Sequence, residues 1–182
     1  MAAAPFIVYL LLLPGPVAAG CAAALFFIAT NTDFLDGYIA RSYGSGTTLG
    51  KFLDPLADKV LVVSALIMLV GTPQLPRVPG WIVAVIVIRE ILVTGLRAIA
   101  AAEGLVMAAE ELGKYKMVLQ SIAVQGLIIR YTYFHIDFFA AGMFMLWIAM
   151  GLSVWSGADY HVKAIRLLTP KPQAIPQKRA AV

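Results

Sequence analysis

Residues 33–58 read DFLDGYIARSYGSGTTLGKFLDPLAD, and this stretch decides how the chain is interpreted. It places four carboxylates, those of Asp33, Asp36, Asp54 and Asp58, at the facing ends of two largely apolar segments. On helices, the 33/36 and 54/58 spacings each put two carboxylates on one face. Four acidic groups close together repel one another unless cations lie between them, and hard divalent ions prefer carboxylate oxygens. The stretch therefore predicts a metal site formed by the four aspartates.

Helix capping is the alternative role for a single aspartate in this stretch. Asp54 precedes Pro55, which is typical of an N-cap followed by proline at the first helical position. Capping does not account for Asp36 or Asp58, which fall within helical segments. Four charges are also more than the nearby cations can offset, which are Arg41, Lys51 and Lys59. We therefore expect metal binding by the four together.

The composition predicts a multi-spanning membrane protein of one transmembrane domain. Of 182 residues, 61% are hydrophobic and 13% are charged. A span needs about 20 helical residues, so the first apolar segment is too short and the other five can cross. The apolar segments are 3–13, 17–39, 56–70, 81–102, 112–129 and 138–156. We expect an all-α bundle of six transmembrane helices whose first helix is truncated.

The basic residues are distributed unevenly between the two sides of such a bundle. If the aspartate-rich ends share one side, alternation of the spans places twelve of the fourteen Lys and Arg residues on that side. The positive-inside rule makes this side cytoplasmic. The twelve are Arg41, Lys51, Lys59, Arg89, Arg97, Lys114, Lys116, Lys163, Arg166, Lys171, Lys178 and Arg179, whereas Arg77 and Arg130 lie opposite. The sequence thus predicts a multi-pass inner (cytoplasmic) membrane protein with its acidic cluster facing the cytosol.

The net charge of +4 follows from this sidedness and does not indicate nucleic-acid binding, because no groove-reading motif is present. Residues 1–162 form the expected transmembrane domain. Residues 163–182 are expected to be a basic, proline-containing cytosolic tail that begins with a short amphipathic piece. The single Cys21 allows no intramolecular disulfide.

The pattern D-x-x-D-G-x-x-A-R-x8-G-x3-D-x3-D, which residues 33–58 fill at every fixed position, resembles the signature of the CDP-alcohol phosphotransferases. Residues 88–97 (IREILVTGLR) and 113–120 (GKYKMVLQ) are similar to one branch, the bacterial phosphatidylglycerophosphate synthases. The resemblance runs from about residue 5 to about residue 160. It implies an enzyme that transfers a phosphatidyl group from a CDP-activated lipid.

The resemblance implies two divalent cations, Mg²⁺ with Mn²⁺ able to substitute, held by Asp33, Asp36 and Asp54 with Asp58 close by. Such ions neutralise a diphosphate and stabilise the leaving phosphate. The family assigns the general base to Asp58, although a fourth metal ligand without base function is the alternative. The resemblance places the CDP moiety on the small residues Gly37, Ala40 and Gly50, and its diphosphate on Arg41, whose guanidinium matches phosphate oxygens.

The second substrate needs residues outside this motif. Arg89 and Arg97 are about two turns apart on one span, and Lys114 and Lys116 open the next span on the same side. Cations at membrane depth are costly unless paired, so they mark a polar cavity, and Glu90 could pair with one arginine. We expect these four cations to bind the acceptor phosphate, with Arg97 and Lys114 as the leading candidates. Interfacial cations that snorkel to water are the alternative.

The sequence therefore predicts transfer of the phosphatidyl group of CDP-diacylglycerol to sn-glycerol 3-phosphate, which gives phosphatidylglycerophosphate and CMP. The partners are these two substrates and the lipid bilayer, and the resemblance suggests a homodimer. One alternative is a relative that uses an inositol phosphate, serine or phosphatidylglycerol as acceptor. The other is a membrane protein that binds the CDP-lipid without catalysis. The intact aspartates argue against lost chemistry.

Overall fold

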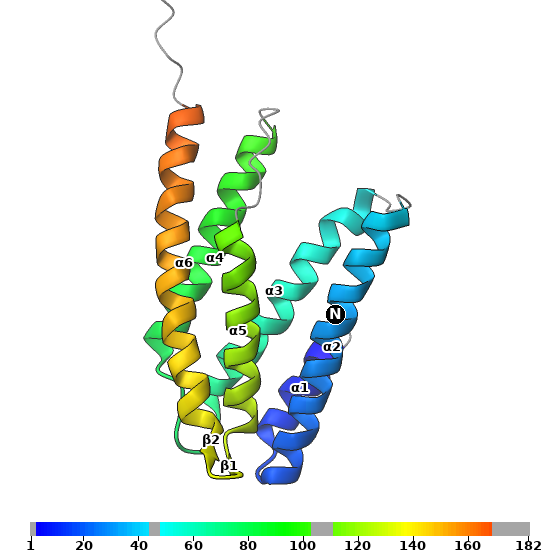
Figure 1. Ribbon diagram of the computed structural model, residues 1–182, viewed down its shortest axis with the longest axis vertical. Coiled ribbons are helices and arrows are strands. Elements are labelled where there is room, and N and C mark those ends of the chain that lie inside the picture. Colours follow the sequence, from blue (N-terminus) through cyan, green and yellow to red (C-terminus); the bar gives the residue numbers. More distant parts are fainter. Residues whose placement is uncertain (1–2, 44–47, 103–110, 169–182) are drawn as a thin grey trace, which may run out of the picture.

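The computed structural model describes residues 3–43, 48–102 and 111–168, and it describes side chains at 3–32, 59–100, 102 and 115–165. Within these residues the chain forms helices and one short β-hairpin (Figure 1). In chain order the elements are α1 (Ala3–Leu12), α2 (Pro16–Tyr43), α3 (Thr48–Gly71), α4 (Gly80–Ala102), α5 (Glu111–Ile129), β1 (Thr132–Tyr133), β2 (Ile136–Asp137) and α6 (Phe138–Leu168). The predicted all-helical character is confirmed apart from this hairpin.

Successive helices run in opposite directions, so their ends collect at two poles of the bundle (Figure 1). The end of α2, the start of α3, the end of α4, the start of α5 and the end of α6 point to the pole at the top of Figure 1. The α1–α2 and α3–α4 turns and the hairpin lie at the opposite pole. The residues of the aspartate motif therefore lie toward the same pole as the end of α4, the start of α5 and the end of α6, which carry basic residues.

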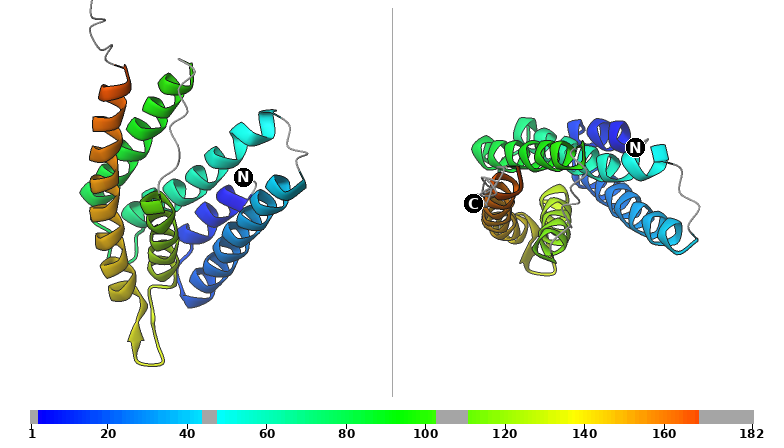
Figure 2. Two further views of the ribbon diagram at one scale, coloured as in Figure 1. Left: turned by 45° about the horizontal axis from the view of Figure 1, so that its top comes forward. Right: turned by 90° about the horizontal axis from the view of Figure 1, so that it is seen from above.

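Helix α5 occupies a central position, because it contacts α2, α3 and α6 (Figure 2). Its contact with α6 is close at two glycines: a Cβ added to Gly142 would lie 2.8 Å from the backbone nitrogen of Leu127, and one added to Gly126 would lie 3.1 Å from Cα of Gly142. The core around this contact consists of apolar side chains, which include Phe26, Leu66, Ile86, Leu127 and Leu146. Close packing of α5 on α6 fixes the frame on which α4 is held.

A polar link joins the loops at the lower pole. The side-chain amide of Gln74 donates to the carbonyl of Leu13 at 2.9 Å, and its oxygen accepts from Nη1 of Arg130 at 2.9 Å. These residues come from the α1–α2 turn, the α3–α4 loop and the position directly after α5. The link ties three connections together on the side away from the aspartate motif.

Helix α3 begins earlier than its apolar segment suggests. It starts at Thr48, so Asp54 and Pro55 lie inside the helix and not at its N-cap and first turn. The capping alternative for Asp54 is therefore wrong. Hydropathy marked only the apolar part of the helix, because the preceding turns carry charged residues that are compatible with a helix but not with a lipid-facing surface. Helix α6 likewise continues past Ser156 to Leu168, across the boundary expected at 162/163.

One helix of the described part is long and apolar enough to cross a bilayer, namely α6, at 138–165 with a mean hydropathy of 1.8. Shorter apolar helical stretches occur at 3–12, 16–32, 59–71 and 115–129. In α4, Arg89, Glu90 and Arg97 interrupt an otherwise apolar sequence. Large apolar side chains nevertheless cover the outside of the bundle, among them Phe144, Trp155 and Ile91, which are 63%, 71% and 66% exposed.

Candidate functional site

The aspartate motif lies on the end of α2 and the beginning of α3. Helical backbone through these residues keeps Asp33 with Asp36, and Asp54 with Asp58, on shared faces, as their spacing predicts. The side chains at 33–58 lie outside the described ones, so the predicted contacts of this motif stay predictions. They concern Asp33, Asp36, Gly37, Ala40, Arg41, Gly50, Asp54 and Asp58. Where side chains are described, no group of three His, Cys, Asp or Glu residues could hold a metal ion.

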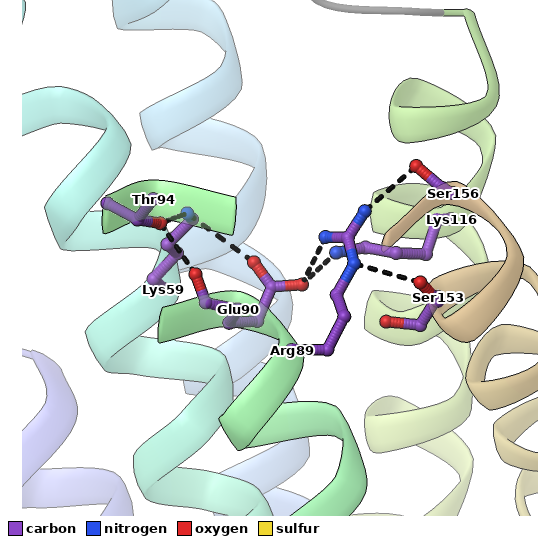
Figure 3. Close-up of polar contacts among 7 residues, drawn as sticks. All are labelled: Lys59, Arg89, Glu90, Thr94, Lys116, Ser153 and Ser156. Carbon is purple, nitrogen blue, oxygen red and sulfur yellow. Dashed lines mark hydrogen bonds and ion pairs between the residues drawn. The ribbon is translucent and has the colours of Figure 1, made fainter. Parts of the chain in front are cut away.

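A cluster of charged side chains lies next to this motif, where α3, α4 and α5 meet (Figure 3). Its centre is the carboxylate of Glu90 in α4, and we call it the Glu90 cluster: Glu90, Lys59, Arg89 and Lys116. Oε1 of Glu90 accepts from Nη1 of Arg89 at 3.0 Å and also from Nζ of Lys116, and Oε2 lies 3.4 Å from Nζ of Lys59. Three cations therefore share one carboxylate.

Arg89 connects α4 to α6. Its Nε donates to the carbonyl of Ser153 at 2.9 Å, and its Nη2 donates to Oγ of Ser156 at 2.8 Å. The side chain lies across Gly157, since a Cβ added there would come within 3.0 Å of Cγ of Arg89. With the ion pair to Glu90, the guanidinium is held on three sides, which fixes its orientation.

Lys59 connects α3 to α4. It follows Asp58 directly in sequence, and its ammonium donates to Oγ1 of Thr94 as well as approaching Glu90. The hydroxyl of Thr94 donates in turn to the backbone carbonyl of Glu90 at 2.7 Å. This bond orients the hydroxyl oxygen of Thr94 as an acceptor toward Lys59. The helix that carries Asp54 and Asp58 is thereby joined to the Glu90 cluster.

The structure brings together two of the four cations predicted for the acceptor phosphate, Arg89 and Lys116. Arg97 is exposed and forms no ion pair with any residue whose side chain is described, and the side chain of Lys114 lies outside the described ones. Glu90 was expected to pair with one arginine, and it pairs with three cations. This gathering of cations is consistent with a site for an anion.

Sequence reasoning missed Lys59, Ser153 and Ser156 as members of this region. Ser156 lies within the apolar sequence of α6, which is the signal that could have indicated a polar partner, and its buried hydroxyl accepts from Arg89. Ser153 contributes only its backbone carbonyl, which no side-chain pattern marks, and its buried hydroxyl has no hydrogen-bond partner among the described residues. Lys59 was considered only as a cation that offsets the charge of the aspartates. Its position directly after Asp58 is the signal that could have placed it at the same pole as the basic residues of α4 and α5.

Comparison with known proteins agrees with the motif on α2 and α3. Residues 1–155 match the family model described as CDP-alcohol phosphatidyltransferase, which covers most of the chain. The chain belongs to the CDP-alcohol phosphatidyltransferase family. This family is enzymatic and membrane-associated.

Relatives with curated names narrow the branch of the CDP-alcohol phosphatidyltransferase family. A Bacillus subtilis protein named CDP-diacylglycerol–glycerol-3-phosphate 3-phosphatidyltransferase is 47% identical over 148 residues, covering 81% of this chain and 75% of the relative. A Haemophilus influenzae protein of the same name is 40% identical and covers 86% and 83%. A rice protein named cardiolipin synthase (CMP-forming) is 34% identical and covers 92% of this chain and 55% of the relative. The chain is thus similar to relatives that carry two different enzyme names.

Proposed function

We propose that this chain transfers the phosphatidyl group of CDP-diacylglycerol to sn-glycerol 3-phosphate, with phosphatidylglycerophosphate and CMP as products. The observation that carries the proposal is the position of the Glu90 cluster: one carboxylate and three cations, joined through Lys59 to the helix of the aspartate motif. The names and identities of the bacterial relatives support the same acceptor.

The donor is proposed to bind at the motif on α2 and α3. Gly37, Ala40 and Gly50 leave space for the cytidine, and Arg41 pairs with the diphosphate. Four carboxylates on two helices suit hard divalent ions, and the internal position of Asp54 in α3 leaves it available as a ligand and not as a cap. Asp33, Asp36, Asp54 and Asp58 would hold two such ions, which we expect to be Mg²⁺. When bound, the ions neutralise the diphosphate and stabilise the departing CMP.

The reaction itself needs no covalent enzyme intermediate. The hydroxyl oxygen of the acceptor attacks the phosphorus of the phosphatidyl group, and the bond from that phosphorus to the bridging oxygen breaks. CMP leaves with the bridging oxygen, and the hydroxyl proton passes to the carboxylate of Asp58 as general base. Arg97 and Lys114 are proposed to contact the acceptor phosphate, while Arg89 and Lys116 supply positive charge from the Glu90 cluster.

The bundle is proposed to span the inner (cytoplasmic) membrane six times, with the aspartate motif on the cytosolic side. The exposed apolar surface of the helices supports burial in lipid, because soluble monomers rarely expose so many large apolar side chains. The polar substrate then enters from the cytosol, and the lipid donor enters from the bilayer. A homodimer, suggested by the resemblance, belongs to the same proposal.

Phosphatidylglycerol as acceptor is the second candidate, because the rice cardiolipin synthase covers 92% of this chain at 34% identity. Its phosphate is a diester with one negative charge, whereas glycerol 3-phosphate carries a phosphate monoester with about two near neutral pH. The Glu90 cluster has a surplus of positive charge, which favours binding of the more highly charged phosphate monoester. This charge difference distinguishes the two candidates.

An acceptor panel tests the proposal. Membranes that contain the chain would receive CDP-diacylglycerol with glycerol 3-phosphate, phosphatidylglycerol, serine or inositol phosphate, each with and without EDTA. We expect product only with glycerol 3-phosphate and only without EDTA. Product from phosphatidylglycerol alone would support the second candidate, and product in none of the mixtures would favour a protein that binds the lipid without catalysis.

A further inference from the structure

The Glu90 cluster has an interior side and an accessible side, which differ in the exposure of their side chains. On the interior side, the side chains of Arg89 and Lys116 are 11% and 7% exposed. On the accessible side, the side chain of Lys59 is 36% exposed, while that of Glu90 is 10% exposed. A ligand that approaches the cluster from the solvent therefore meets Lys59 first.

The interior cations are already engaged by protein groups. Arg89 donates to Glu90 and to two acceptors of α6, and its stem lies against Gly157. Lys116 donates to Glu90 and is buried with it. Neither can reach a bound anion without giving up a buried contact, which is costly for a charged group. Their main effect is to hold Glu90 and to offset its charge.

Lys59 is positioned differently. It reaches Thr94 and Glu90 from α3, and the contact to Glu90 at 3.4 Å is longer than the 3.0 Å contact of Arg89. Its ammonium has three donors and stays partly accessible. Because it follows Asp58 in sequence, it also lies near the helix face where the proposed reaction takes place. It is the member of the cluster best placed to contact a substrate.

The charges of the cluster favour a dianionic ligand. One carboxylate and three cations leave a surplus of two positive charges, one among the buried members and one on the partly exposed Lys59. A surplus of charge that is shielded from water is unfavourable unless an anion compensates it. A phosphate monoester supplies about two negative charges near neutral pH. The surplus charge of the cluster and the charge of the ligand are thus opposite in sign and similar in size.

We infer that Lys59 contacts the phosphate of the acceptor and that Glu90, with Thr94, is the positioning residue that presents it. Arg89 and Lys116 then act through Glu90 and do not touch the substrate. This inference rests on the proposed function, since it assigns residues to the acceptor side of the same reaction. It divides the three cations of the Glu90 cluster into one that binds the phosphate and two that support Glu90.

Steady-state kinetics of Lys59→Met and Lys59→Arg test the inference, with each substrate varied in turn. Loss of one charge-assisted contact predicts that Lys59→Met raises the KM for glycerol 3-phosphate by about 10- to 150-fold, with the KM for CDP-diacylglycerol little changed. Inorganic phosphate, a competitive probe of the acceptor site, should lose inhibition by a similar factor. Lys59→Arg keeps the charge and should recover most of the affinity.

Thr94→Val tests the positioning role without leaving a buried charge unpaired. It removes one partner of Lys59 but leaves the ammonium in place, so it should raise the KM for glycerol 3-phosphate by about 2- to 10-fold, which corresponds to the typical net value of one hydrogen bond. Arg77→Met, an exposed cation of the α3–α4 loop at the opposite pole, is the matched control and should match the wild type.

Two outcomes would overturn the inference. In one, Lys59→Met lowers kcat or raises the KM for CDP-diacylglycerol, while the inhibition by inorganic phosphate is unchanged. In the other, Lys116→Met raises the KM for glycerol 3-phosphate more than Lys59→Met does. Both require a wild-type protein that uses glycerol 3-phosphate, so they differ from failure of the proposed function, in which the wild type itself gives no product from that acceptor.

Discussion

At the scale of single residues, the chain concentrates its charged chemistry at one pole. Glu90 is the described residue on which most of it depends, because it holds Lys59, Arg89 and Lys116 from three different helices. Removing one partner of a buried ion cluster usually lowers the stability of the fold by more than the intact cluster adds to it, since the remaining charges are left without compensation. The arrangement therefore serves orientation of charge more than stability.

The first prediction concerns the carboxylates of the motif. Asp36→Asn or Asp54→Asn should lower the transfer rate by more than about 100-fold. Mutation of a residue that only hydrogen-bonds to a metal ligand typically lowers activity by about 10- to 100-fold, and loss of the ligand itself should have a larger effect. The amount of protein in the membrane fraction should be unchanged. Asp159→Asn, which removes an exposed carboxylate paired with Lys163 in α6, is the control and should keep normal activity. Near-normal rates of either motif variant at limiting Mg²⁺ would contradict the two-metal site.

The second prediction separates the two roles considered for Asp58. If Asp58 accepts the hydroxyl proton, Asp58→Asn should lower kcat by about 10²- to 10⁴-fold and leave the KM for CDP-diacylglycerol nearly unchanged, because the lost interaction belongs to the transition state. Rates over a range of substrate and Mg²⁺ concentrations would check it. A large rise in the Mg²⁺ requirement, with kcat restored at saturation, would instead identify Asp58 as a metal ligand only.

The residues of the site were only partly predictable from the sequence. The spacing of the aspartates predicts a shared helical face, and the helical backbone of α2 and α3 agrees with it. Arg89 and Lys116 were expected in one basic pocket and do meet, at Glu90. Lys59 was missed, because spacing within one helix does not reveal which side chains meet between helices.

At the scale of elements, the positions of the helices follow from hydropathy and from glycine and proline at the turns. Pro14, Gly15 and Pro16 are typical turn residues between the first two apolar segments, and the structure has Gly15 at φ 110° there, a conformation that glycine adopts readily. The hairpin was not predicted. Its turn residues Phe134 and His135 have φ of 51° and 65°, and bulky residues rarely adopt such values, so no local signal marks the turn.

The third prediction concerns the crossing of α5 and α6. Gly142→Ala should lower the free energy of unfolding by about 1–3 kcal/mol, because the added Cβ would meet backbone atoms at 2.8 Å and 3.0 Å, which cannot move as a flexible side chain can. Thermal unfolding in detergent would measure it. Gly151→Ala, in the same helix with nothing within 4 Å, is the matched control and should be neutral or slightly stabilising. Equal midpoints for the two variants would show that the close approach does not matter.

At the scale of the whole molecule, the alternation of the helices agrees with the expected separation of charge. The loop that contains Arg77 lies at the lower pole of Figure 1, opposite the ends of α2, α4 and α6. Sequence reasoning predicted this order because short turns force neighbouring helices to run in opposite directions. It could not predict that α5 contacts α2 and α3, since such contacts depend on the shapes of helix faces.

The fourth prediction concerns orientation in the membrane. Single cysteines at Gly44 and at Leu75, which is 78% exposed, would be introduced in a Cys21→Ala background because Cys21 is exposed. In intact cells, an impermeant reagent should modify the cysteine at 75 and spare the one at 44, since the basic pole faces the cytosol. Permeabilised cells should allow both to react. Modification of both positions in intact cells, or of 44 alone, would contradict the six-span arrangement.

The central claim is transfer of a phosphatidyl group to glycerol 3-phosphate, and a product balance with the purified chain tests it most directly. The chain would be placed in lipid vesicles with CDP-diacylglycerol, labelled glycerol 3-phosphate and Mg²⁺, and both CMP and labelled lipid would be measured over time. Direct displacement predicts one labelled lipid with a terminal phosphate for each CMP released, and neither product in EDTA. Release of CMP without labelled lipid, or labelled lipid that still forms in EDTA, would contradict the account.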